Sequence, residues 1–156
     1  MKALVVYYSR SGNTAKIAQR VANALECGIE EIIDTKNRSG VLSYIRSGRD
    51  AGSKSLTVLK EPINDPADYD LVVIGTPLWA GHVSTPVRTY IHQNQDKLKS
   101  VAFFCTARGE KFSGAFDDMR DLSGKDPVAT LGIRAKEIKN KTYSEKIQEF
   151  IKSIPM

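Results

Sequence analysis

Cysteine is scarce in this chain, which has only Cys27 and Cys105 among its 156 residues. Two cysteines do not make a disulfide framework, and a reducing cytosol is the simplest setting for them. Long apolar runs are absent too, so no segment reads as a membrane-spanning helix. The first predicted strand, residues 3–8, begins directly after Lys2, which leaves no room ahead of it for a signal peptide. We therefore expect a cytoplasmic protein that has no contact with a membrane.

Acidic residues are scarce in one segment, residues 35–60, where Asp50 is the only one. Six basic residues accompany it, so the segment has a net charge of +5, equal to the formal charge of the whole chain. Such a local basic surface favours an acidic partner or ligand. No helix-turn-helix signature, zinc spacing or RNA-binding aromatic motif is present, and we expect no nucleic-acid partner. The basic residues are Lys36, Arg38, Arg46, Arg49, Lys54 and Lys60.

Short apolar runs alternate with segments of helical spacing along the chain. This alternation predicts an α/β fold, a doubly wound five-stranded parallel sheet with helices on both faces. The common strand order for five such strands is 2-1-3-4-5. We expect one domain over residues 1–156, a length that suits a single core. The predicted strands are 3–8, 29–34, 69–75, 100–106 and 128–133, and the predicted helices include 15–25, a short helix capped by Ser39, one from Thr85 and 113–122.

The hexapeptide at residues 9–14, Ser-Arg-Ser-Gly-Asn-Thr, joins the first predicted strand to the first helix. Backbone N–H groups and the positive end of the helix dipole meet at such a turn, so an anion is stabilised there. Gly12 lets the backbone approach that anion closely. Serine, asparagine and threonine are favoured helix caps, but a single cap needs only one of them. The loop therefore predicts a phosphate site.

A second unusual loop, Thr76–Val83, follows the third predicted strand. In the order 2-1-3-4-5 the strand order reverses between strands one and three, and ligands bind at that reversal. We therefore expect the two loops to be neighbours. Trp79 offers a flat apolar surface in the second loop, while His82 is interpreted either as a surface residue or as a proton donor. A phosphate cradle beside a flat aromatic surface suits flavin mononucleotide (FMN).

The two loops carry a resemblance to a known family. Residues 9–14 resemble the phosphate loop of flavodoxins, Gly75–Gly81 is similar to their flavin loop after strand three, and Cys105–Gly109 takes the place of their second flavin loop. The resemblance implies non-covalently bound FMN and electron transfer through its ring. It implies no catalytic side chain and no metal. The cofactor-binding residues that it implies are Ser9, Arg10, Ser11, Gly12, Asn13, Thr14, Thr76, Pro77, Leu78, Trp79, Ala80, Gly81, Thr106, Ala107, Arg108 and Gly109.

The chain also departs from the flavodoxin pattern. Carrier flavodoxins are typically acidic, whereas the sequence pI here is about 9.2, and the loop after strand four lacks an aromatic residue. Two roles stay open: an electron carrier, or an oxidoreductase of NAD(P)H or quinone type that reduces a small acceptor. A redox partner protein would dock at the basic residues 35–60. The alternative is a non-catalytic binding module of the same fold that holds another phosphate-bearing ligand.

Other phosphate-handling proteins of similar topology need residues that this chain lacks. A low-molecular-weight phosphatase needs a cysteine nucleophile in the first loop. A P-loop NTPase needs the Gly-x4-Gly-Lys-Ser/Thr pattern, and a nicotinamide-binding Rossmann domain needs three spaced glycines where only Gly12 stands. The first loop is therefore predicted to hold a ligand without reacting with it.

Overall fold

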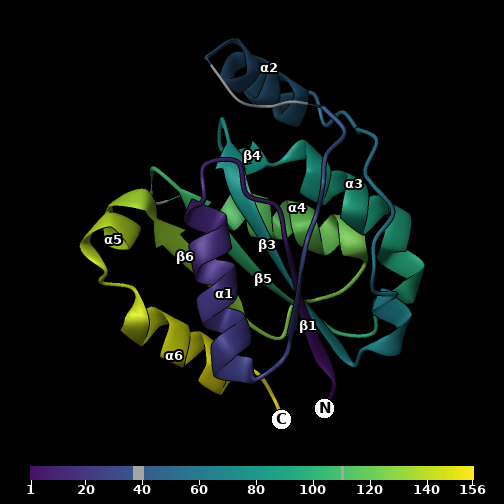
Figure 1. The fold of residues 1–156 in the computed structure, drawn as a ribbon, viewed down its shortest axis with the longest axis vertical. Helices are drawn as coiled ribbons and strands as arrows, with labels where there is room; N and C mark the ends of the chain where they lie inside the picture. Colours follow the sequence, from purple (N-terminus) through teal and green to yellow (C-terminus); the bar gives the residue numbers. More distant parts are fainter. Residues whose placement is uncertain (37–40, 110) are drawn as a thin grey trace.

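The computed structural model describes residues 1–36, 41–109 and 111–156, and for residues 41–44 only the backbone. Its centre is a parallel sheet in the order β2-β1-β3-β5-β6 (Figure 1). This confirms the predicted α/β fold and strand order, with one short strand added. The strands are β1 (Ala3–Tyr7), β2 (Gly28–Glu31), β3 (Leu71–Trp79), β4 (His82–Val83), β5 (Val101–Ala107) and β6 (Thr130–Arg134).

Helices cover both faces of the sheet (Figure 1). One face packs against α1 (Asn13–Leu25), α5 (Ala135–Asn140) and α6 (Ser144–Ser153). The other packs against α3 (Thr85–Asn94) and α4 (Ser113–Ser123). Successive side chains along a strand point to opposite faces of the sheet, so each strand contributes to both layers. Val5 and Val73 pack on the face covered by α1, α5 and α6, and Val6 and Ile74 pack on the face covered by α3 and α4.

One helix, α2 (Val41–Gly52), does not lie flat on either face. It sits beyond the carboxyl ends of the central strands, above β4 (Figure 1). Two chain segments lead to and from it, and Asp34 and Leu59 form an antiparallel bridge between them. The basic residues Arg46 and Arg49 of α2 therefore lie at the end of the sheet where ligands bind in folds of this kind.

The segment predicted as a loop at residues 76–83 is a β-hairpin instead. Strand β3 continues to Trp79 and pairs with β4 across a two-residue turn, Ala80–Gly81. Both turn residues have positive φ, 51° and 79°. Hairpins with two-residue loops favour that geometry because it matches the twist of the strands. The prediction of a loop was wrong because the turn contains only one glycine and no polar residue.

Helix boundaries differ from the predictions in three places. Ser84, and not Thr85, is the N-cap of α3, and Pro86 stands in its first turn. Helix α2 runs through Gly48, although a glycine inside a helix disfavours its continuation and would be expected to end or loosen it. Helix α5 was not predicted. The predicted cap Ser39 lies outside the described residues. Within those residues, no helix has both the length and the apolar character to cross a membrane.

Candidate cofactor-binding site

A cavity of about 330 Å³ opens at the carboxyl edge of the sheet, between the first loop and the ends of β3 and β5. This volume falls within the range of small-molecule sites. Ten of its lining residues were predicted from the sequence, so residues far apart in the chain do meet in one place. The lining residues are Arg10, Ser11, Asn13, Thr14, Pro77, Leu78, Trp79, Thr106, Ala107, Arg108 and Ala135.

The first loop presents the start of α1 to this cavity. Gly12 is the N-cap and has φ of 99°, and its N–H donates to Ser9 Oγ at 3.1 Å. No side-chain hydrogen bond caps α1 within the described residues, and its first turn carries no acid. The uncapped N–H groups and the helix dipole therefore favour an anionic group at this end of the cavity.

The hydroxyl groups of Thr14 and Thr106 join the first loop to the end of β5. Their Oγ1 atoms lie 2.8 Å apart, and both side chains are buried. A hydrogen bond between two buried hydroxyls fixes the start of α1 against the sheet. It also sets the distance between the polar end of the cavity and the strand that carries Ala107 and Arg108.

Trp79 lies in a different setting from the one expected. It is the last residue of β3 and is 4% exposed, so the prediction of an exposed loop aromatic was wrong. Its ring meets Tyr8 edge-on, with 5.5 Å between centroids and 86° between planes. Trp79 still lines the cavity, together with the partly buried Pro77 and Leu78. The cavity therefore has one polar and one apolar end.

Thr76 supports the hairpin and does not line the cavity. Its side chain is fully buried, and its Oγ1 accepts the N–H of Ser84 at 3.1 Å and donates to the carbonyl of Pro77 at 2.8 Å. Five other predicted residues also lie outside the cavity lining: Ser9, Gly12, Ala80, Gly81 and Gly109.

Ala135 lines the cavity and was missed by the sequence analysis. It is the first residue of α5 and follows β6 directly. An alanine carries no chemical signal of its own. The topology did carry one, since parallel strands end at the same edge of the sheet and residues after the last strand face the same crevice.

The charges lining the cavity are those of Arg10 and Arg108, and none of the described lining residues is acidic. Cys105 stands just before Thr106 and is fully buried, and this burial raises the pKa of its thiol. It is therefore no nucleophile toward the cavity. The described part of the chain holds no cluster of three or more residues that could bind a metal ion. The two arginines favour an anionic ligand.

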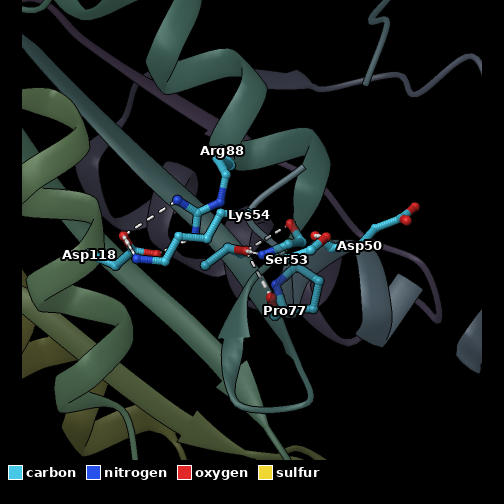
Figure 2. Close-up of polar contacts among 8 residues, drawn as sticks. Asp50, Ser53, Lys54, Pro77, Arg88 and Asp118 are labelled. Carbon is cyan, nitrogen blue, oxygen red and sulfur yellow. Dashed lines mark hydrogen bonds and ion pairs between the residues drawn. The ribbon is translucent and has the colours of Figure 1, made fainter. Parts of the chain in front are cut away.

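Helix α2 is tied to the hairpin side of the site. Its Ala51 is fully buried in the same apolar cluster as Trp79. Just after the helix, Lys54 Nζ lies 4.0 Å from Asp118 Oδ1 on α4, and Asp118 also pairs with the buried Arg88 of α3 (Figure 2). These contacts place α2 beside the cavity that Trp79 lines.

Comparisons with known proteins agree with this arrangement. A family model described as Flavodoxin matches residues 2–154. The fold is similar to that of a flavoprotein solved in complex with FMN from Lactobacillus acidophilus, at 22% identity over 92% of this chain and 98% of that one, with a TM-score of 0.70. A Bacteroides eggerthii protein described as a flavoprotein matches at 22% identity over 90% and 94%, with a TM-score of 0.74. An NADH:FMN oxidoreductase in its apo form matches at 14% identity over 99% and 91%, with a TM-score of 0.54.

Proposed function

Because this chain belongs to the flavodoxin family, we propose that it binds FMN in the cavity at the carboxyl edge of the sheet and serves in electron transfer. The observation that carries the proposal is the division of this cavity. One end has the uncapped start of α1, and the other has the apolar surfaces of Pro77, Leu78 and Trp79. When bound, FMN supplies one- or two-electron chemistry through its ring.

The residues present fit this cofactor. The N–H groups of the first turn of α1 and the side chains of Ser11, Asn13 and Thr14 would hold the phosphate. At the other end, Leu78 and Trp79 would contact the ring and keep water away from it. Donors directed at an anion and an apolar wall for a ring together match the two chemically different ends of FMN.

Arg10 and Arg108 would stabilise negative charge on the ligand. Both line the cavity, and Arg108 is exposed at its edge. A cation near a bound group favours the more negative form of that group. We therefore expect these two arginines to raise affinity for the phosphate and to stabilise the reduced cofactor.

Titration of the purified protein with FMN tests the proposal. The sequence contains a single tryptophan, Trp79, and it lines the cavity, so its fluorescence reports on occupancy there. We expect saturable quenching at one FMN per chain and a visible spectrum that stays with the protein through gel filtration. If excess FMN causes no quenching and no absorbance stays with the protein, the chain would instead be a binding module for another ligand.

Assays with FMN-loaded protein then separate two versions of the role. Turnover with reduced nicotinamide and a quinone would make the protein an oxidoreductase, and its absence would make it a carrier. For a carrier, the basic residues 35–60 would dock an acidic redox partner, since Arg46 and Lys54 are exposed there. Reduction by such a partner should then slow steeply as salt is raised, because complementary charges steer the encounter.

A further inference from the structure

A second hollow of about 380 Å³ lies between α2 and the turn of the β3–β4 hairpin. We call it the α2 groove, and its lining residues are Ile45, Gly48, Arg49, Trp79 and Ala80. Trp79 lines both this groove and the FMN cavity, so the two sites share a wall.

The α2 groove is narrow and mostly apolar. Gly48 contributes no side chain to it, and a Cβ atom there would lie 3.4 Å from the Cβ of Ala80. The backbone of α2 therefore approaches the hairpin closely at this point. Ile45, 61% exposed, forms an apolar rim that a soluble protein would otherwise hide from water. No ring fits between Gly48 and Ala80, but a flat apolar molecule that lies along the groove beside this contact, against Ile45 and Trp79, would remove apolar surface from water.

Among the described residues that line the α2 groove, Arg49 alone is charged. It is exposed, and it forms no ion pair with a described residue. The neighbouring FMN cavity adds Arg10 and Arg108, and neither hollow has an acid among its described lining residues. Both hollows therefore attract an anion, and the planar guanidinium of Arg49 suits a carboxylate or sulfonate held through two hydrogen bonds.

We propose that the α2 groove binds a flat aromatic molecule bearing an acidic group. The ring lies against Ile45 and Trp79, beside the contact of Gly48 with Ala80, and the acidic group pairs with Arg49. Binding in the groove follows from its own geometry and does not require FMN. That the bound molecule is the substrate of the protein, an acidic aromatic electron acceptor, rests on the proposed function.

Binding of anthraquinone-2-sulfonate to the FMN-loaded protein, measured by isothermal titration calorimetry, tests this site. Arg49→Gln should weaken binding about tenfold, the scale of one charge-assisted contact. Gly48→Leu fills the groove and should abolish binding. Arg46→Gln is the matched control, because Arg46 is an exposed arginine on the same helix that does not line the groove. It should leave the affinity within twofold.

Three outcomes would overturn the inference. The sulfonate gives no saturable heat, or Arg49→Gln and Arg46→Gln weaken it equally, or it displaces FMN and so binds in the cofactor cavity. Trp79 fluorescence in the FMN-free protein provides a second measurement and separates the two proposals. Because Trp79 lines both hollows, quenching by the sulfonate supports the groove only if Arg49→Gln weakens it. Such quenching without quenching by FMN would refute FMN binding, and quenching by FMN alone would refute the groove. Circular dichroism of Gly48→Leu shows whether this variant keeps its helix content. Ile45→Asp, at an exposed position on the rim, provides a second variant that should repel the sulfonate without filling the groove.

Discussion

Thr14 and Thr106 are 92 positions apart in the chain, and their hydroxyl oxygens lie 2.8 Å from each other at the cofactor cavity. The first is 1% exposed and the second 4%. Both side chains are buried at the wall of the cavity, and each hydroxyl provides the other with a hydrogen-bond partner. The pair links the loop that would hold the phosphate to the strand that carries the far edge of the cavity.

Thr106→Val should lower the free energy of unfolding by about 1–2 kcal/mol, because it leaves a buried hydroxyl of Thr14 without a partner. The double variant Thr14→Val/Thr106→Val should lose less than the sum of the single losses, since both polar groups are then gone. Urea unfolding of the four proteins measures this coupling. Thr142→Val, at an exposed threonine, should change little. Additive losses would show that the two hydroxyls do not depend on each other.

Gly12 should matter for the ligand beyond its effect on stability. Gly12 and Gly124 both have positive φ, 99° and 68°, and open space where a Cβ would stand. Alanine at either position should cost about 1–2 kcal/mol of stability through backbone strain. Only Gly12 begins the helix that faces the cavity, so only Gly12→Ala should weaken FMN, by about tenfold or more. Equal FMN affinities of the two variants would contradict the placement of the phosphate at α1.

The ion pair of Arg88 and Asp118 should be costly to break from one side. Arg88 is 3% exposed on its side chain, and Asp118 pairs with both Arg88 and Lys54 (Figure 2). Asp118→Ala leaves a buried guanidinium unpaired and should cost about 3–5 kcal/mol in urea unfolding. Lys97→Ala removes the surface pair with Asp65, in which both side chains are half exposed, and should cost far less. Similar losses for the two variants would mean that Arg88 finds another partner or water.

The sheet could be predicted from the sequence because its strands are short, apolar and separated by helical spacing. Apolar residues such as Val5, Val73 and Phe103 are fully buried, and their burial in the strands does not depend on the structure of any single loop. The position of the cavity was predictable for the same reason, since parallel topology alone brings the ends of β1 and β3 together.

What could not be predicted depended on contacts between distant segments. Trp79 reads as a loop residue because prolines and glycines surround it, but pairing with β4 and packing against Tyr8 bury it. The place of α2 above the hairpin depends on fully buried small residues such as Ala51. The residue pattern of one segment does not show which distant segment it will contact. Ala135 was missed because its role comes only from where β6 ends.

The start of α5 gives a prediction that depends on pH. Glu137 accepts the backbone N–H of Arg134 at 2.8 Å and pairs with Lys146 Nζ at 2.6 Å, next to Ala135 in the cavity wall. Burial acts to raise the pKa of Glu137, but these partners hold the pKa below its ordinary value of 4.5. A carboxyl with a lowered pKa stabilises the fold above its unfolded-state pKa, and the gain is lost as the pH falls through the folded-state pKa.

Glu137→Gln should therefore destabilise the protein by about 1–2 kcal/mol at neutral pH, because the charge-assisted hydrogen bond from Lys146 is lost. The difference in the free energy of unfolding between variant and parent should narrow as the pH falls below 4.5. It should close once the carboxyl of the parent is protonated. Urea unfolding at several pH values measures the gap, with Glu145→Gln as the control at an exposed glutamate in the first turn of α6. A gap that stays constant with pH would assign the loss to the shape of the glutamine side chain. A gap that closes would show that the charge of Glu137 fixes the start of α5 and, through Ala135, one wall of the cofactor cavity.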